Sequence, residues 1–406
     1  WRTFLLKTKK CAITPLQFIS YNWIKSKHFD EPDKYSGEGS VKELADRLIK
    51  DNVKHVFIAA SRSVMRLELL SVFIEKIQSH SIKYTVFTDI QSDPTIENIE
   101  YGLKIFNGNK CDCVLAAGGG SVIDCAKIIA LRASNPNKSV IQMTNYFTPL
   151  KKSVPVYVIP TTSGSGSEAT MFSVITNAAE ERKCPVLTSK FMPRAVVLDP
   201  DMSVNLPQKI TAYTGMDALT HAIEAYISTF ADEFPEDKKK APYACKLIFE
   251  NLHTAFISPD DKDVRLKMSE ASYYAAIAFR RISTGYVHAI AHRIGELYHV
   301  PHGCANAILL PYILEEYMPA IEHNLAELSE YCGFSNYNTS DNKSSYVFIN
   351  KIKQLNKQLN IPDKLTCLDE KDFDLIIRRS NAEARLQGRP IRFSSSELKK
   401  ILIKLK

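Results

Sequence analysis

The sequence predicts an α/β protein in which a doubly wound parallel-sheet domain is followed by an all-helical domain. Three observations favour this fold class. Short apolar runs alternate with amphipathic helical periods up to about residue 200, which is the order typical of a parallel sheet packed against helices. Beyond that point the strand pattern largely stops and long helical periods follow. The chain of 406 residues is also too long for one ordinary core.

The first half alternates predicted helices and strands. An amphipathic helix at Val41–Lys50 precedes the buried strand HVFIAA at His55–Ala60. Further helices are predicted at 66–77, 96–106 and 121–133, and further strands at 83–90, 111–117, 154–160 and 194–200. Because helix and strand alternate along the chain, the strands are expected to form one parallel sheet.

The second half is predicted to be helical. Its helical periods begin at Gln208, Lys238, Asp263, Val287 and Ala305. A polar stretch at 336–345 predicts a surface loop. We therefore expect an α/β domain at 1–205, with 1–35 as an N-terminal extension, and an all-helical domain at 206–406.

Composition excludes several classes of protein. Hydrophobic residues make up 45% of the chain and charged residues 24%, as in ordinary soluble proteins. The net charge of +7 is modest, and the lysines are mixed with acids, so no nucleic-acid surface is expected. No apolar run approaches the roughly 18 residues of a membrane span. The basic, aromatic N-terminal stretch lacks a signal-peptide pattern, although it leaves a peripheral membrane or subunit contact open.

The nine cysteines predict free thiols. They are odd in number, and no two have the Cys-x-x-Cys spacing. Together with the missing secretory signal, this pattern predicts a cytoplasmic protein.

A glycine-rich turn follows the third predicted strand, at Gly118-Gly119-Gly120-Ser121. Glycine permits close approach of a ligand to the backbone, and the first helical N–H groups favour an anion. Ser121 is a suitable N-cap, and Asp124, one turn on, faces a ligand or is an ordinary first-turn acid. The turn predicts a phosphate site, with a plain tight turn as the alternative.

A second polar turn, PTTSGSGSE at 160–168, follows the fourth predicted strand. Its hydroxyl groups, including those of Thr161, Thr162 and Ser165, are suited to binding a pyrophosphate or ribose. A flexible linker is the alternative. Because both turns follow strands of one sheet, they favour nucleotide binding at the carboxyl edge of that sheet.

Histidines are concentrated in one short segment. The chain has ten, and four of them lie between residues 284 and 302. His288 and His292 are spaced i, i+4, as are Asp217 and His221 earlier in the chain, and each such pair shares a helix face. With His302, one carboxylate and several imidazoles suit a divalent ion such as Fe²⁺, Zn²⁺ or Mn²⁺. The alternative is a set of polar core residues, because spacing does not show that the two segments meet.

Four segments resemble the iron-containing (group III) alcohol dehydrogenases. They are GGGSVIDCAK (118–127), PTTSGSGSEAT (160–170), VVLDPDM with GMDALTHAIEAY (196–202, 215–226), and GYVHAIAHRIGELYHVPHGCANAILLP (285–311). Their order and approximate spacing match the family. The resemblance covers residue 37 to the C-terminus and weakens beyond Gly333.

The resemblance implies a role for each matching residue. Asp217, His221, His288 and His302 match the metal ligands, and His292 matches a histidine beside the nicotinamide. The dinucleotide site is implied at Gly119, Gly120, Ser121, Asp124, Thr161, Thr162 and Ser165, and by a looser alignment at Lys183. His299 matches no functional position and is expected to be structural. The resemblance thus implies a dinucleotide-binding domain followed by a metal-binding, catalytic domain.

The first strand departs from the family pattern. The family commonly has an Asp at its end, where this chain has Ser61-Arg62. A carboxylate there would bind the adenosine ribose and repel a 2′-phosphate, whereas Arg62 offers a cation. We therefore expect NADP(H) to be favoured over NAD(H). Asp93, on the expected adenosine side, argues weakly against this preference.

The expected activity is reversible hydride transfer between a primary alcohol or aldehyde and the nicotinamide. A metal, Fe²⁺ or alternatively Zn²⁺, would act as Lewis acid, and His292 would relay the proton. The resemblance also implies a homodimer. Two alternatives remain, a glycerol or polyol dehydrogenase of the same superfamily and a catalytically silent nucleotide-binding scaffold. The sequence does not reveal which alcohol or aldehyde is the substrate.

Overall fold

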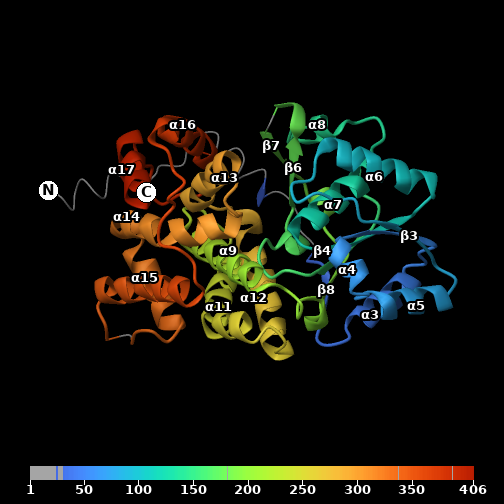
Figure 1. Cartoon of the computed structure of the whole chain (residues 1–406), viewed down its shortest axis with the longest axis horizontal. Coiled ribbons are helices and arrows are strands. Elements are labelled where there is room, and N and C mark those ends of the chain that lie inside the picture. Colours follow the sequence, from blue (N-terminus) through green and yellow to red (C-terminus); the bar gives the residue numbers. More distant parts are fainter. Residues whose placement is uncertain (1–23, 26–30, 181, 337, 386) are drawn as a thin grey trace. The chain divides into compact units, whose positions relative to one another are not determined.

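The structure is a computed structural model that describes residues 24–25, 31–180, 182–336, 338–385 and 387–406. Most of the predicted N-terminal extension, 1–23 and 26–30, lies outside the described residues. By its contacts the chain forms two compact units (Figure 1). One comprises the sheet up to Leu206 together with Pro259–Tyr273, and the other comprises Pro207–Ser258 and Tyr274–Lys406.

A six-stranded parallel sheet forms the first unit. Its order is β1-β8-β5-β4-β2-β3. The strands are β1 Asp33–Ser36, β2 His55–Ala60, β3 Lys83–Phe87, β4 Cys113–Gly118, β5 Val156–Pro160 and β8 Ala195–Leu198. The chain passes from β2 outward to β3 and then returns to place β4 on the other side of β2. The strand order therefore reverses between β2 and β4, where ligands bind in open α/β sheets.

Helices cover both faces of this sheet. Alternate strand residues, including Val56 and Ile58, pack against α3 (Val41–Lys50) and α5 (Ser71–Ser79). On the other face, the ring of Phe57 lies 5.7 Å from that of Phe106 in α6 (Ile96–Gly108). Helix α7 (Gly120–Ser134) contacts α6, β4 and β5. Figure 1 shows these two layers on either side of the strands, which confirms the doubly wound fold.

Several elements of the first unit differ from expectation. The helix predicted at 66–77 is correct only from Ser71 onward, because the chain forms α4 (Arg62–Arg66) and α5, with Glu68 between them at φ 52°. Strand β1 is a short polar edge strand without an apolar run. An antiparallel pair, β6 (Phe172–Asn177) and β7 (Arg182–Leu187), and the short helix α8 (Val140–Met143) were also not predicted.

The second unit is helical. It contains α9 (Gln208–Ile227), α10 (Pro235–Lys238), α11 (Lys240–Ile257), α13 (Tyr286–Tyr298), α14 (His302–Tyr331), α15 (Asp341–Gln358), α16 (Phe373–Ala384) and α17 (Ser395–Leu405). The first half of α12 (Lys262–Ile282) belongs to the sheet unit, and its second half belongs to this unit. The loop predicted at 336–345 is too long, because α15 begins at Asp341.

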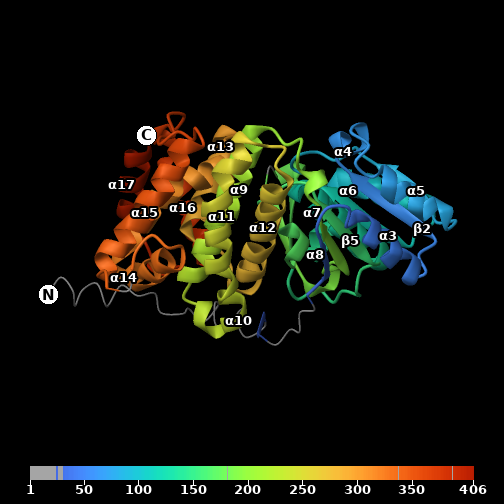
Figure 2. The same ribbon diagram turned by 90° about the horizontal axis from the view of Figure 1, so that it is seen from below.

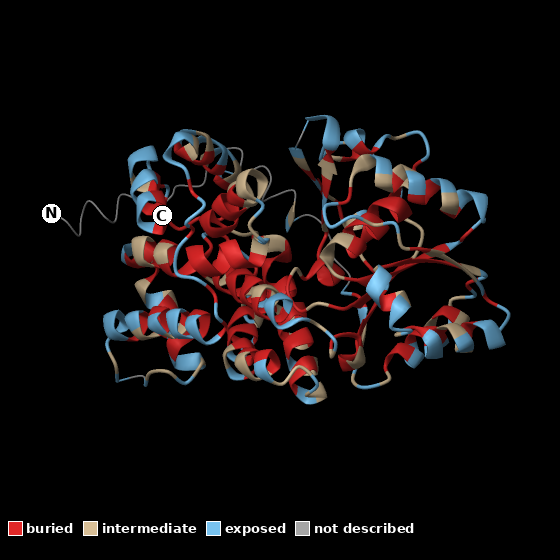
Figure 3. Ribbon diagram, viewed as in Figure 1, coloured by how far each residue is buried: buried red, intermediate tan, exposed pale blue. Residues whose placement is uncertain are grey.

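Helix α9 lies at the centre of the second unit. It packs against α11 and α14, and α11 runs beside it in Figure 2. All of its residues from Gly215 to Ala225 are buried, whereas outer helices expose one face (Figure 3). Polar side chains on α9 therefore lie in the interior, where they need specific partners. Among the described residues, no helix has the length and apolar character of a membrane span.

Candidate metal and nucleotide sites

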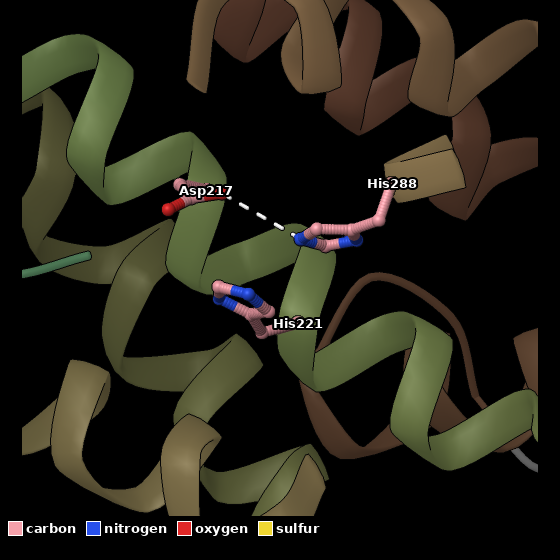
Figure 4. Close-up of side chains that lie close together, drawn as sticks. All are labelled: Asp217, His221 and His288. Carbon is pink, nitrogen blue, oxygen red and sulfur yellow. Dashed lines mark ion pairs between the residues drawn. The ribbon is translucent and has the colours of Figure 1, made fainter. Parts of the chain in front are cut away.

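Three of the predicted metal ligands meet in the second unit. Asp217 and His221 lie one turn apart on α9, and His288 approaches from α13 (Figure 4). One ligand atom from each lies within 4.8 Å of the others, and all three side chains are buried. The rings of His221 and His288 stack with centroids 4.4 Å apart. A carboxylate and two imidazoles at this spacing suit a divalent transition metal.

Glu224 orients His288. Its Oε2 lies 2.6 Å from Nδ1 of His288, and its Oε1 accepts a hydrogen bond from the amide of Val287 at 2.9 Å. The contact holds the ring so that Nε2 faces Asp217 Oδ1 at 3.7 Å. This buried Nε2 makes no hydrogen bond with any described residue. A buried imidazole nitrogen without a hydrogen bond, beside a carboxylate, fits a metal ligand whose other nitrogen donates to a carboxylate.

Replacing Glu224 with Gln should weaken metal binding by about 10- to 100-fold, because His288 would lose its anionic partner. Chelator competition measures the metal dissociation constant without any assay of turnover. Glu250→Gln, an exposed change on α11, is the matched control and should leave the constant unchanged. Equal metal affinity in the two variants would refute this role for Glu224.

His302 lies beside the three ligands without joining their tight group. Its Nε2 is 3.5 Å from Asp217 Oδ1, at the first residue of α14. Asn306, one turn on and fully buried, places its Nδ2 2.7 Å from Asp217 Oδ1 and 3.1 Å from His302 Nε2. His302 is therefore positioned to supply a fourth ligand once the Nε2 of His302 is no longer in contact with Asn306.

Electrostatics favour an ionised carboxylate at this centre. Burial alone would raise the pKa of Asp217, but the surrounding histidines His221, His302 and His288 outweigh burial and hold the pKa below its usual value. An ionised acid is the protonation state that a metal needs from a carboxylate ligand.

His292 has a different environment from the ligand histidines. Its ring stacks on His302 with centroids 4.9 Å apart, and its Nδ1 lies 2.7 Å from Glu383 Oε1 on α16. Arg293 donates to the other oxygen of Glu383 at 2.9 Å. The side chain of His292 is 28% exposed, against 3% for His288 and 38% for His302. His292 therefore has the solvent access that a proton relay needs.

In the sheet unit, the two polar turns come together. Gly119 caps α7 and Gly120 begins it, while Thr161 donates its amide to Gly118 O at 3.0 Å. A Cβ built on Gly120 would lie 2.6 Å from Ser165 Oγ, and one on Gly119 would lie 3.3 Å from Thr162 Oγ1. These short distances explain why both positions are glycine, because the second turn packs too closely on the first to leave room for a side chain. The contacts place hydroxyl groups around the N-terminus of α7, an arrangement suited to phosphate.

Ser121 and Asp124 face protein groups. The hydroxyl of Ser121 donates to Ser92 O. The carboxylate of Asp124 is buried and accepts the amide of Val174, in β6, at 2.8 Å. Asp124 thus joins α7 to the β6–β7 pair, and it lies beyond the first turn of α7.

Two further ionisable groups are buried beside this turn. Lys127 donates to the carbonyls of Thr170 and Phe172 at 2.8 and 2.9 Å, and burial lowers its pKa to about 8. Burial raises the pKa of Glu168 to about 7. Lys127 thus holds the segment that follows the hydroxyl-rich loop, and neither residue was singled out from the sequence.

Glu168 should make stability depend on pH. Its pKa is higher in the folded state than in the unfolded chain, so its contribution is present at low pH and is lost as pH rises through about 7. Glu168→Gln removes this titration. The variant should gain about 3 kcal/mol relative to wild type between pH 4 and pH 8. Urea unfolding at both pH values measures the difference, and the exposed Glu180→Gln provides the control. A difference that is the same at both pH values contradicts the prediction.

The carboxyl end of β2 brings Ser61 and Arg62 to the strand reversal. The amide of Ser61 donates to Ala117 O of β4 at 3.1 Å, and its hydroxyl caps α4. Arg62 is exposed and pairs with Asp89 at 2.6 Å. Lys183 pairs with Asp93 at 2.9 Å. Each of the two predicted cations is thus paired with an acidic residue of the same unit.

Comparison with known proteins assigns the family. The model of the iron-containing alcohol dehydrogenases matches residues 32–200, and that of the family's C-terminal region matches residues 211–405. "Alcohol dehydrogenase 4" of Saccharomyces cerevisiae is 32% identical over 92% of this chain and 96% of its own length. The chain belongs to the iron-containing alcohol dehydrogenase family. The family implies a bound metal and NAD(P), and the residues described above fit both groups.

Two other similar proteins match almost the whole chain. A protein of Clostridium saccharobutylicum named "NADPH-dependent butanol dehydrogenase" is 32% identical over 91% of this chain and 95% of its own. A crystal structure of 1,3-propanediol oxidoreductase superposes with a TM-score of 0.88 at 28% identity, covering 94% of this chain and all of the other. The fold of the iron-containing family is therefore confirmed for both units.

Sequence reasoning missed three residues of the metal site, Glu224, Asn306 and Glu383. Glu224 lies seven residues after Asp217, so its position on the same helix face was detectable from spacing. Asn306 lies four residues after His302 in α14, so that contact was also detectable from spacing, whereas Glu383 reaches His292 from α16 and no spacing pattern predicts its contact. Cys304 is buried, and the eight cysteines within the described ranges are free thiols. His299 ends α13 in the left-handed conformation, with φ 56°.

Proposed function

We propose that the protein is a metal-dependent alcohol dehydrogenase that interconverts a primary alcohol and its aldehyde with NADP(H) in preference to NAD(H). The observation that carries this proposal is the buried group Asp217, His221 and His288, with Glu224 behind His288. Such a group is suited to a metal with a position left open for substrate. Fe²⁺ is the expected ion, and Zn²⁺ accepts the same ligands.

Some residues of the chain would hold the metal and the dinucleotide, and another would transfer a proton. Asp217, His221, His288 and His302 would hold the metal, and the turns at Gly119–Ser121 and Thr161–Ser165 would hold the dinucleotide. When bound, the metal supplies a Lewis acid for the substrate oxygen and the nicotinamide exchanges the hydride. His292, oriented by Glu383 and partly exposed, would transfer the proton between the substrate oxygen and solvent.

The preference for NADP(H) is proposed from Arg62. The guanidinium is exposed at the carboxyl end of β2, and no carboxylate stands at the position of Ser61. A 2′-phosphate must compete with Asp89 for Arg62, so the preference should be moderate. Arg62→Ala should lower the ratio of kcat/KM for NADPH to that for NADH about tenfold. Arg66→Ala, an exposed change in the same short helix, is the control, and a wild-type ratio below one would refute the preference.

The activity itself is tested by NADPH consumption with a panel of short aldehydes and polyol-derived carbonyls, with the metal content measured on the same sample. Turnover with simple aldehydes supports the proposal. Turnover confined to polyol substrates favours a glycerol or polyol dehydrogenase. Bound metal and cofactor without any turnover would favour a silent scaffold. The cytoplasmic location and the homodimer remain predictions from cysteine spacing and family resemblance.

A further inference from the structure

A cavity of about 540 Å³ lies in the helical unit, lined mainly by α16, α17 and the segment between them. This volume is in the range of sites that bind small molecules. Its polar lining includes Arg385, Arg389, Arg392, Ser394, Ser395 and Glu397. Three guanidinium groups against one carboxylate make the lining strongly basic. None of these residues takes part in the metal or nucleotide sites described above.

Arg389 is the buried member of this arginine cavity. Its side chain is 2% exposed, although a guanidinium remains charged at any pH at which the protein is folded. Its Nη1 donates to Ala384 O, but its Nε is buried without a hydrogen bond to any described residue. Arg389 forms no ion pair within the described part of the chain. A buried cation without an anionic partner is costly, and a bound anion would remove that cost.

Arg385 and Arg392 are exposed and reach the same cavity from either side of Arg389 in the sequence. Within the described ranges, neither forms an ion pair or a side-chain hydrogen bond. The one acidic residue of the lining, Glu397, accepts hydrogen bonds from the amide and hydroxyl of Ser394 at 2.8 Å. The arginines therefore retain their donors for a ligand.

The remaining walls of the arginine cavity strengthen its attraction for an anion. Tyr286 and Phe393 are buried, with ring centroids 5.0 Å apart, and Phe393 stacks on Tyr317 at 4.9 Å. Apolar walls reduce the local dielectric constant, which strengthens ionic contacts. Helix α17, of eleven residues, begins at Ser395 on the cavity wall, so its dipole adds a further attraction for an anion.

We propose that the arginine cavity binds a small phosphorylated molecule, with its phosphate held by Arg385, Arg389 and Arg392 at the N-terminus of α17. Planar guanidinium forks match phosphate oxygens, and a phosphate offers more acceptors to three arginines than a carboxylate does. The cavity is larger than a phosphate group, which leaves room for an organic portion against Tyr286 and Phe393.

Inorganic phosphate is the probe, titrated calorimetrically into the full chain with its metal at constant ionic strength. Phosphate bound at the glycine-rich turn would not distinguish the cavity variants from wild type, so comparison of the variants isolates the arginine cavity. We expect saturable binding that weakens about tenfold in Arg385→Gln and in Arg392→Gln, since each loses a charge-assisted contact. Both residues are exposed, so the variants should fold. Arg378→Gln, an exposed arginine of α16 outside the cavity lining, should bind phosphate as wild type does.

Three results would overturn the proposal. They are no saturable binding by the wild-type protein, equal affinity in the two cavity variants and the Arg378 variant, and acetate binding as tight as that of phosphate. The first two show that the cavity is not an anion site, and the third shows that it does not select phosphate. None of these measurements depends on turnover, so the inference stands or fails separately from the proposed activity.

Discussion

His288→Ala is expected to lose the bound metal and nearly all dehydrogenase activity. His288 is one of three buried side chains proposed as ligands, and among the described residues its Nε2 has no hydrogen-bond partner that would give it another role. Removing a ligand should weaken metal binding by more than the roughly 100-fold upper value for loss of a supporting residue. Turnover should fall by more than about 10³-fold, because Lewis-acid catalysis contributes several kcal/mol to the barrier.

His292→Ala is the matched variant, one helical turn away. It should keep its metal and lose about 10²-fold in turnover, the scale of proton-transfer catalysis. Elemental analysis and turnover of both proteins separate the two roles, and thermal unfolding checks that each variant folds. Equal metal loss in the two variants would show that His292 is also a ligand, contrary to the division proposed here.

Gly303→Ala is expected to cause a large loss of stability in the helical unit. A Cβ on Gly303 would lie 2.0 Å from the carbonyl oxygen of Tyr213 and 2.6 Å from its carbonyl carbon. Both are backbone atoms of α9, so no side-chain rotation removes the clash and α14 must move away. The cost should be about 3 kcal/mol, which corresponds to a fall in Tm of about 5–10 °C.

The same displacement should weaken metal binding, because His302 precedes Gly303 and Tyr213 lies one turn before Asp217. Gly295→Ala provides the control, since a Cβ there would meet its nearest atom, Val300 O, at an ordinary 3.5 Å. The control should be neutral or stabilising by up to about 1 kcal/mol, because alanine favours helix over glycine. Calorimetry and chelator competition measure both effects. A Gly303 variant with the Tm and metal affinity of the Gly295 variant contradicts the prediction.

Local patterns account for the parts of the fold that were predicted. The predictions at Val41–Lys50 and His55–Ala60 coincide with α3 and β2. An amphipathic period is typical of a helix packed on a sheet, and a short, wholly apolar run is typical of a buried strand. Strand β1 was missed because its four residues, DKYS, are polar and gain stability only by pairing with β8. The α4–α5 break was missed because its turn depends on Glu68 adopting a positive φ, for which the sequence has no glycine signal.

The sequence by itself determined which residue types were available for chemistry and which pairs shared a helix face. Asp217 with His221, and His288 with His292, follow from a spacing of four. Only the tertiary structure decided which of these residues meet and which partner each histidine ring contacts. Helix α13 presents His288 to Asp217 and His292 to Glu383, because Glu224 and α16 hold the two rings from different directions. Contacts between distant helices depend on how whole faces pack, and no local pattern of residues carries that information.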